Sequence, residues 1–491
     1  MESTAAPSNQ PAESLASRVR SAVIWRSGSQ ILAQIVQWAA TFLVIRILSP
    51  ADYGLFAMTG VVLVFLNMLN GYGLASGLIQ QQDVTRQQIR QLFGMLLVLN
   101  VTLGVAQVAL APLAAAYYRQ PEVANLLRVQ ALLYLATPFI ALPYALLSRE
   151  MEFAAQARIN ILASIASAAA ALGGALVHLG VWTLVFAPTV LFGVRAIGMT
   201  IAARTFVRPS FDFRGAGHLA RYGGVMAAGQ LFWFLQSQCD VFIAGRSFSA
   251  HELGIYTTSL FLTQIFVSKF VPPLNEVAFS AYARIQHDDQ AIARAFVRAT
   301  QVIMVAALPF YLGLAATAEP LVLTMLGEKW AEAVPVVHLL AFAMPFMTLQ
   351  VLLSPACDAR GRPSVGMKNG AFGALVLAAS FVVGVRWGAS GIAVAWVVAY
   401  PLYLGVSLWR SLPVIGARAR DLAVAIAPPL FAATAMALVV TIVDRLLPAM
   451  VPAMRLAMLS ATGAAVYGLW LWVFARDLVR ELVGLVRNRG G

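Results

Sequence analysis

The sequence predicts an all-α integral membrane protein of about 14 transmembrane helices, built as two pseudo-symmetric six-helix lobes around a central cavity plus two extra C-terminal helices. The composition, the number of apolar segments and an internal repeat lead to this prediction. Of the 491 residues, 60% are hydrophobic and 11% are charged, whereas about 25% are charged in a typical soluble domain. Soluble domains of this total length would need a charged surface that the chain cannot supply, so the composition excludes a soluble enzyme.

Fourteen apolar segments are candidates for membrane spans, because a hydrocarbon core of about 30 Å needs about 20 residues of helix. Very short turns, at residues 178–181 and 386–388, divide the fifth span from the sixth and the eleventh from the twelfth. The predicted spans are 21–47, 53–79, 92–117, 123–147, 159–179, 181–203, 221–246, 254–281, 296–317, 332–354, 366–386, 388–409, 422–443 and 455–475.

The basic residues predict the orientation of the chain. Most of the 34 Lys and Arg side chains fall in alternate gaps between the spans, beginning with the segment before the first span. Cytoplasmic loops are enriched in these residues, so we expect both termini in the cytoplasm. Residues 1–17 are polar and lack Lys and Arg, which predicts a disordered tail rather than a cleaved signal peptide. Residues 477–491 are expected to form a second tail.

The sequence lacks the patterns of an ATPase or a metalloprotein. The gaps between predicted spans are too short to hold a catalytic domain. The two cysteines and five histidines show no metal-ligand spacing, and the phosphate-binding pattern GxxxxGK[ST] does not occur. We therefore expect a transporter without a cofactor and without catalytic residues. Its driving force would be the membrane potential, the substrate gradient or an ion gradient, with H⁺ and Na⁺ as candidate ions.

One short segment occurs twice, 200 residues apart. Arg46–Phe56 reads RILSPADYGLF, and Arg246–Tyr256 reads RSFSAHELGIY. In both copies a serine is followed three residues later by an acid, which is the pattern of a capping box at the start of a helix. Six spans separate the copies, so the two halves have the same orientation, which predicts a pseudo-two-fold axis along the membrane normal and alternating access. The expected divisions are an N-lobe at 18–215, a C-lobe at 216–415 and two further spans at 416–476.

Three phrases carry a resemblance to a known family. RILSPADYGLFAM at 46–58, LLSREMEF at 146–153 and LGEKWAEAVP at 326–335 resemble the Wzx-type polysaccharide transporters of the multidrug/oligosaccharidyl-lipid/polysaccharide superfamily. The resemblance extends from about residue 18 to residue 475. It implies a flippase of the bacterial inner membrane that moves undecaprenyl-pyrophosphate-linked oligosaccharide repeat units to the outer leaflet. Polymerases and export machinery then use the units for exopolysaccharide, O-antigen or capsule.

Basic residues inside predicted spans are the candidates for binding the pyrophosphate, because such charges are costly unless they face a cavity or a partner. Arg26 lies near the cytoplasmic end of span 1, where it could equally snorkel to lipid headgroups. Arg195 lies near the middle of span 6, with a structural ion pair as the alternative role. Lys269 precedes Pro272-Pro273 in span 8. Arg128 lies near the outer end of span 4, where snorkelling is the favoured explanation.

Acidic and amide side chains complete the predicted site. Asp240 and Glu276 are the acids inside the spans and are candidates for binding a coupling ion, with an interhelical ion pair as the alternative. Gln30, Gln34 and Gln37 recur at helical spacing, so they share one face. That face could hydrogen-bond sugars, or it could hold helices together.

Two other functions compete with the flippase. A multidrug-type cation antiporter of the same superfamily would be expected to have about twelve spans and a more acidic cavity. A membrane-embedded polysaccharide polymerase or ligase would need a large outer loop with catalytic Arg or His. The sequence has fourteen predicted spans, more bases than acids inside them, and no large outer loop.

Overall fold

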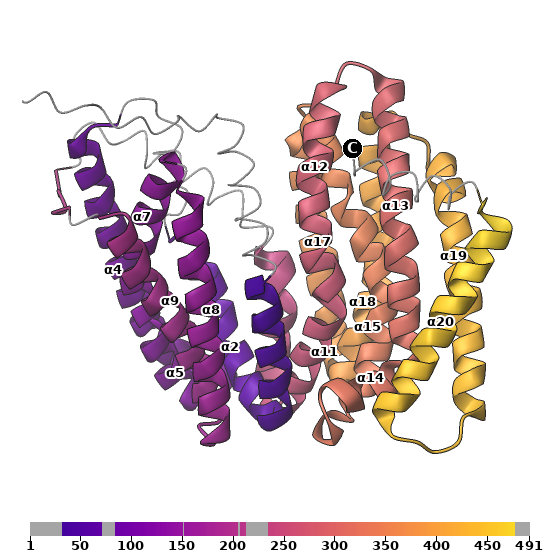
Figure 1. Cartoon of the computed structure of the whole chain (residues 1–491), viewed down its shortest axis with the longest axis horizontal. Coiled ribbons are helices and arrows are strands. Elements are labelled where there is room, and N and C mark those ends of the chain that lie inside the picture. The colour runs from indigo at the N-terminus through magenta and orange to yellow at the C-terminus, as the bar shows by residue number, and fades with distance from the viewer. Residues whose placement is uncertain (1–31, 71–83, 151, 205–206, 213–233, 477–491) are drawn as a thin grey trace, which may run out of the picture. The chain divides into compact units, whose positions relative to one another are not determined.

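The computed structural model describes residues 32–70, 84–150, 152–204, 207–212 and 234–476, and the regular elements among them are all helices (Figure 1). Ten helical stretches within these residues are long and apolar enough to cross a membrane. This confirms the predicted all-α membrane class, whereas the number 14 is approximate. Predicted spans 11 and 12, for example, merge into one apolar stretch, Pro363–Ile415.

The chain divides into two compact units. The first contains the residues up to Val44, Leu66–Pro112 and Ala124–Ala227, and the second contains Ile45–Phe65, Leu113–Val123 and the residues from Ala228 onward. The second unit therefore includes most of helix α2 (Pro50–Asn67) and the last residues of α4 (Arg86–Tyr118).

Small side chains hold the first unit together. Its helices α8 and α9 pack side by side, and Gly174 allows this because a Cβ atom there would lie 3.0 Å from the Thr183 hydroxyl. The hydroxyl of Ser167 donates to the Ala187 carbonyl across the same pair, 2.9 Å away. The helices of this unit are most of α4, then α5 (Glu122–Gln130), α6 (Leu132–Ala136), α7 (Pro138–Arg149), α8 (Phe153–Leu176) and α9 (Trp182–Ala202).

The predicted fourth span is a broken helix. It consists of α5, α6 and α7, which are separated at Ala131 and Thr137. Pro138 lacks an N–H group and cannot continue the ladder of hydrogen bonds from α6. Near the first break the Gln107 amide of α4 donates to the Leu127 carbonyl at 2.7 Å, and the same carbonyl accepts from the Ala131 N–H at 3.0 Å. Broken helices are tolerated in a membrane where the surrounding protein bonds to the backbone at the break.

The second unit is a larger bundle. Its closest packed pairs are α13 with α19, α17 with α18, α15 with α18, and α19 with α20. Besides α2, Leu32–Ile47 reaches it with its last residues, and residues 234–247 form a helix within it. Its other elements are α11 (Ala250–Lys269), α12 (Val271–Arg284), α13 (Asp289–Ala316), α14 (Ala318–Met325), η1 (Glu328–Trp330), α15 (Ala333–Val351), α16 (Leu353–Ala359), α17 (Pro363–Gly384), η2 (Val385–Trp387), α18 (Gly388–Ile415), α19 (Ala419–Leu446) and α20 (Pro452–Phe474).

A three-residue ionic network fastens the last two helices to this bundle. The Arg455 guanidinium of α20 bonds both carboxylate oxygens of Asp444 in α19, at 2.6 and 2.9 Å. It also lies 3.2 Å from Glu319 in α14. Bidentate pairs of this kind have a defined geometry, so the network holds three helices in register at one end of the bundle.

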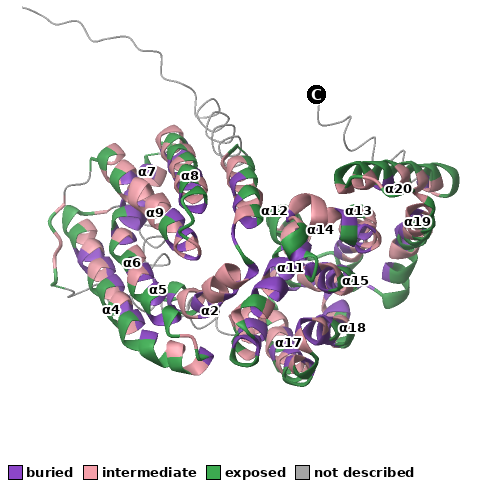
Figure 2. Ribbon diagram, turned by 90° about the horizontal axis from the view of Figure 1, so that it is seen from below, coloured by how far each residue is buried: buried purple, intermediate pink, exposed green. Residues whose placement is uncertain are grey.

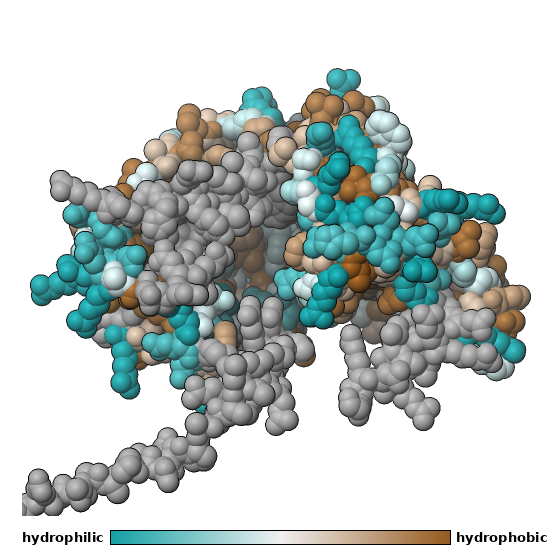
Figure 3. Space-filling view, turned by 90° about the horizontal axis from the view of Figure 1, so that it is seen from above, coloured by the Kyte–Doolittle hydropathy of each residue, from teal (hydrophilic) through white to brown (hydrophobic). Residues whose placement is uncertain are grey.

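The surfaces of both units are apolar along the helices, as a membrane protein requires. Large hydrophobic side chains such as Ile197, Leu375 and Trp409 are more than 60% exposed, and exposed residues follow the outer faces of the helices in Figure 2. Hydrophilic residues gather instead at the end of the second unit that carries the α12–α13 connection (Figure 3). Arg360 joins the α12–α13 connection to the end of α18 there, because it bonds the carbonyls of Gln286 and Val414 and pairs with Asp289.

Candidate functional site

A buried carboxylate lies inside the second unit. Asp240, on the helix formed by residues 234–247, is 1% exposed. The Tyr256 hydroxyl of α11 donates to one of its oxygens, Oδ2, at 2.6 Å. The same hydroxyl accepts from the Trp396 indole of α18 at 2.9 Å. Three helices thus meet through a chain of two hydrogen bonds.

The second oxygen of this carboxylate is available. Among the described residues, Asp240 Oδ1 is buried and has no hydrogen-bond partner. No salt bridge between described residues includes Asp240. A buried ionised carboxylate without a cationic partner is costly, so the position favours binding of a proton or a cation at Oδ1.

Aromatic rings surround the network on α18. Trp396 and Tyr400 stack with their centroids 5.1 Å apart. The hydroxyl of Tyr403, one turn further, accepts from the Gln350 amide of α15 at 2.6 Å. A glycine on α17 makes room for this ring, because a Cβ atom at Gly373 would lie 2.5 Å from Tyr403 Cζ. Aromatic rings therefore pack around the hydrogen-bonded chain of Asp240, Tyr256 and Trp396.

The other acid and the lysine predicted for this half lie apart from Asp240. Lys269 ends α11 and Glu276 lies on α12, and both are exposed. The two helices are separate because Pro272 and Pro273 follow the break at Phe270. Among the described residues, no hydrogen bond or ion pair engages the Lys269 ammonium or the Glu276 carboxylate. The structure thus leaves both charges free for a ligand.

The predicted residues of the first unit are dispersed. Arg195 lies half-buried on α9. Arg128 is exposed on α5 and bonds the Asn125 side chain at 3.0 Å, within its own helix. Gln34 and Gln37 are half-buried on Leu32–Ile47. Arg26 and Gln30 lie outside the described residues.

The repeated turns differ in their capping. In the first copy the Asp52 carboxylate accepts from both the backbone N–H and the hydroxyl of Ser49, at 2.9 and 2.6 Å, which confirms the predicted capping box. In the second copy Ser249 accepts from the Glu252 N–H at 3.2 Å. The Glu252 carboxylate, however, accepts from the N–H of Ala389 at the start of α18. Half of the second box is therefore replaced by a tertiary contact.

The two copies of the turn touch each other. A Cβ atom at Gly54 would lie 1.8 Å from the Ala250 carbonyl oxygen, and one at Gly254 would lie 1.7 Å from that of Pro50. In each case the partner glycine's backbone nitrogen would be 3.0 Å away. The backbones of α2 and α11 therefore cross in direct contact. The near-identical reciprocal distances show that the contact has local two-fold symmetry.

The arginines of the repeat also act in the same way in both copies. Arg46 donates to the Thr324 carbonyl near the end of α14, at 3.2 Å. Arg246 donates to the Tyr117 carbonyl at the end of α4. Cations are favourable at helix C-termini, where backbone carbonyls lack partners. Each arginine therefore stabilises the end of a helix that is distant in sequence.

Two side chains of the LGEKWAEAVP segment bond to the backbone on either side of Arg46. The Trp330 indole donates to the Ile45 carbonyl at 3.0 Å, and the Lys329 ammonium donates to the Ile47 carbonyl at 2.7 Å. Partial burial lowers the pKa of Lys329, and the Asp52 carboxylate opposes this shift. We name the contacts of Arg46, Arg246, Lys329 and Trp330, together with the Gly54–Gly254 crossing, the outer clasp.

Comparison with known proteins identifies the family. The family described as polysaccharide biosynthesis protein matches residues 43–335. The succinoglycan biosynthesis transport protein ExoT of Rhizobium meliloti is 27% identical over 90% of both chains. The lipopolysaccharide biosynthesis protein WzxC of Escherichia coli is 23% identical over 69% of both chains.

Solved structures show the same fold. The lipid II flippase MurJ, in an inward closed conformation, matches 93% of this chain and 100% of its own, with a TM-score of 0.75 and 12% identity. An inward-facing multidrug transporter of the MATE family matches 80% of this chain and 98% of its own, with a TM-score of 0.61 and 15% identity. The family match spans more than half of the sequence, and the chain therefore belongs to the polysaccharide biosynthesis protein family.

Proposed function

We propose that this protein is a flippase that moves undecaprenyl-pyrophosphate-linked oligosaccharide units from the inner to the outer leaflet of the bacterial inner membrane, by alternating access. The observation that carries this proposal is the relationship to the succinoglycan biosynthesis transport protein over 90% of both chains. The fold supports it, because a lipid II flippase has the same fold. The exported product would be an exopolysaccharide, an O-antigen or a capsule, made with a polymerase and export machinery.

An exposed cationic group at a helix break supports pyrophosphate binding. Lys269 has no ion-pair partner among the described residues and lies at the α11–α12 break. We assign it, with Arg195 and the predicted Arg26, to the phosphates of the substrate. The amides of Gln34 and Gln37 are assigned to the sugars. Arg128 is bonded within its own helix, which favours a structural role for this residue.

Asp240 is the candidate coupling residue. Its buried and unpartnered Oδ1 could take up a proton or Na⁺ when the site faces one side of the membrane. Binding of the ion would remove the cost of a buried charge. Tyr256 and Trp396 connect this event to α11 and α18. A bound ion can thus change how these helices pack, which is what coupling requires.

The orientation with both termini in the cytoplasm also belongs to the proposal. The Arg360 contacts gather the 284–289, 360 and 414 segments at one end of the second unit, and these segments carry bases predicted to be cytoplasmic. The outer clasp would then lie on the periplasmic side. Its opening would release the substrate to the outer leaflet.

A transport assay tests the proposed function. The purified protein is reconstituted into vesicles with a fluorescent undecaprenyl-pyrophosphate oligosaccharide, and the label in the outer leaflet is quenched by a membrane-impermeant reductant. If the protein flips the labelled lipid, all of the label becomes accessible to the reductant with time. If the label in the inner leaflet stays protected equally in vesicles with and without the protein, the proposal is contradicted. Transport of cationic drugs, without flipping of the labelled lipid, would favour the multidrug-type antiporter.

A further inference from the structure

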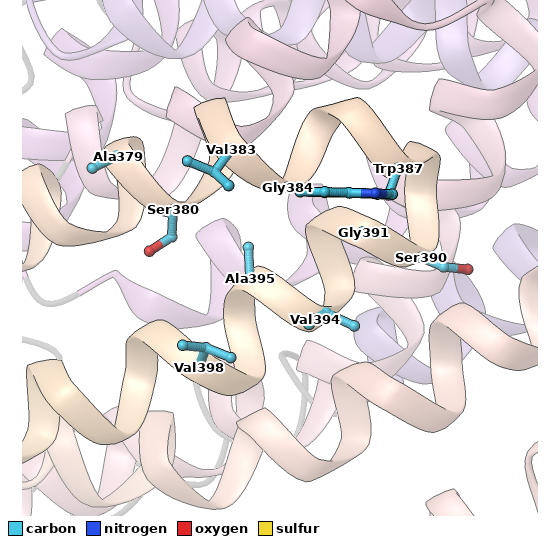
Figure 4. A pocket seen from close by; sticks show the side chains of 10 residues that line it. All are labelled: Ala379, Ser380, Val383, Gly384, Trp387, Ser390, Gly391, Val394, Ala395 and Val398. Atoms are coloured by element: carbon cyan, nitrogen blue, oxygen red, sulfur yellow. The ribbon is translucent and has the colours of Figure 1, made fainter.

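An apolar groove runs along the α17–α18 hairpin. Its volume is about 590 Å³. Valine side chains from both helices form its walls, and the indole of Trp387 lies at the tip of the hairpin (Figure 4). Its lining includes Ser380, Val383, Trp387, Val394, Ala395 and Val398.

Two glycines explain why the groove exists. A Cβ atom at Gly391 would lie 2.3 Å from the Gly384 carbonyl oxygen, and one at Gly384 would lie 2.6 Å from that of Gly391. The two backbones therefore touch at the tip. Beyond the tip, the small side chains of Ser380 and Ala395 do not fill the space between the helices. The valines and the tryptophan that border this space are 46–67% exposed.

An arginine adjoins a lining residue of the groove in sequence. Arg386 directly precedes Trp387 in η2 and is exposed. Among the described residues, no hydrogen bond or ion pair engages its guanidinium. The nearby Glu252 carboxylate accepts instead from the Ala389 N–H. Tryptophan is enriched at the headgroup level of membranes, so this end of the groove suits a lipid with an anionic headgroup.

The length of the groove restricts the occupant to one leaflet. The α18 wall runs from Ser390 to Val398, which is about 12 Å at 1.5 Å per residue. This is less than half of a hydrocarbon core of about 30 Å. A chain that starts at the hairpin tip and points toward the midplane would fill the groove without crossing the membrane. A bilayer lipid, whose acyl chains stay within one leaflet, has this geometry.

We propose that the α17–α18 groove binds one acyl chain of an anionic phospholipid, phosphatidylglycerol, with its phosphate on Arg386. The acyl chain lies between Val383 and Val394, and the Trp387 ring covers its glycerol end. The bound lipid then completes the packing of the hairpin that carries Trp396 of the Asp240 network. The residues that line this groove include neither Lys269 nor any of the assigned substrate residues.

Native mass spectrometry of the full chain tests the proposal. The detergent-purified protein is offered phosphatidylglycerol or phosphatidylcholine with identical acyl chains. Phosphatidylglycerol should be retained preferentially, and Arg386→Gln should reduce that preference about fivefold, as expected for one basic residue near a membrane surface. The matched control is Arg445→Gln, at an exposed arginine on α19, which should leave the preference for phosphatidylglycerol unchanged. Equal retention of both lipids by the unaltered protein, or an unchanged preference in Arg386→Gln, would overturn the headgroup assignment.

A second variant tests the groove itself. Val394→Trp fills the space and should abolish retention of the lipid, whereas Val424→Trp, at an exposed valine of α19, should not. Retention that survives Val394→Trp would place the lipid elsewhere. Undecaprenyl phosphate is added as competitor. If it displaces phosphatidylglycerol and its own binding is lost in Val394→Trp, the groove belongs to the substrate and the proposal is wrong. Because Arg386→Gln leaves the packing intact, it decides the headgroup question even if Val394→Trp does not fold.

Discussion

Asp240 combines three properties at the scale of a single residue: it is buried, it has one bonded oxygen, and its other oxygen is without a partner among the described residues. A carboxylate held only for structure would have both oxygens engaged, since unsatisfied buried polar atoms are costly. This asymmetry distinguishes Asp240 from Asp444, both of whose oxygens bond Arg455.

Replacing Asp240 with asparagine should therefore abolish flipping that depends on an imposed ion gradient, while the protein still inserts and folds. Asparagine keeps a similar shape but cannot release a proton or neutralise a cation. The measurement is transport in vesicles with and without a gradient. Asp358→Asn, at a half-buried acid that bonds Ser354, is the control and should respond to the gradient normally. A gradient response in Asp240→Asn equal to that of the unaltered protein would remove Asp240 from the coupling site.

Tyr256→Phe tests the hydrogen-bond chain. The substitution deprives Asp240 Oδ2 of its donor and the Trp396 indole of its acceptor. Leaving buried polar groups unpaired costs about 1–3 kcal/mol each. We expect a lower midpoint of thermal unfolding in detergent together with an altered pH dependence of transport. An unchanged pH profile would mean that Tyr256 has a structural role alone.

Lys269 is the clearest candidate for phosphate binding in the second unit. Lys269→Gln should lower flipping at least tenfold, because a charge-assisted bond to phosphate is lost. Expression and insertion should not change, since its side chain is exposed. Lys368→Gln, an exposed lysine on α17, controls for the loss of positive charge. If both variants flip equally well, the pyrophosphate is bound elsewhere.

At the scale of elements, the crossing of α2 and α11 depends on two glycines. Gly54→Ala or Gly254→Ala would place a methyl group within 2 Å of a backbone carbonyl oxygen. Backbone cannot rotate away as a side chain can, so the helices must separate, and each variant should lose at least about 1–3 kcal/mol of stability. Thermal unfolding measures this loss.

Gly60→Ala provides the internal control on the same helix, because a Cβ atom there meets nothing within 4 Å. Alanine also has the higher helix propensity, so this variant should be as stable as the original or slightly more so. The effects of Gly54→Ala and Gly254→Ala should not add, since both disrupt one contact. Additive losses would show that the two glycines act independently.

At the scale of the whole molecule, topology is the property that can be tested most directly. A reporter fused at residue 325 should report a periplasmic location, and one fused at residue 365 a cytoplasmic location. The first position ends α14, near the outer clasp, and the second lies in the first turn of α17. Alkaline phosphatase and a fluorescent protein give opposite readouts at each position. A reversed pattern would show that the number of spans before residue 325 was counted wrongly.

Composition and apolar segment length were sufficient to predict the fold class, because they are set by the solvent that surrounds the chain. The capping box at Ser49 and Asp52 was predictable for a different reason, because its partners are three residues apart in sequence. The diversion of Glu252 to Ala389 was not, because the competing backbone N–H comes from a helix 137 residues away. Asp240 was recognised as an unusual charge, but its partners Tyr256 and Trp396 depend on how three helices pack.

The contacts of the outer clasp were not predicted, although the sequence contained the residues that make them. The repeat placed glycines at 54 and 254, and the LGEKWAEAVP phrase placed a lysine and a tryptophan at an outer turn. The sequence alone did not indicate that these features meet. A glycine that recurs in both copies of a repeat, at the same distance from a helix start, is the pattern that could have predicted the crossing.

The reciprocal contact at Gly54 and Gly254 has the form of an isologous dimer interface within one polypeptide. In such an interface the same surface serves both partners, so a protein with a single copy of the turn could use it to associate with an identical chain. A homodimer of half-length chains would already contain this contact. Gene fusion would then join two subunits that had matching interfaces beforehand, and each half could afterwards specialise, as Asp52 and Glu252 have done in their different partners.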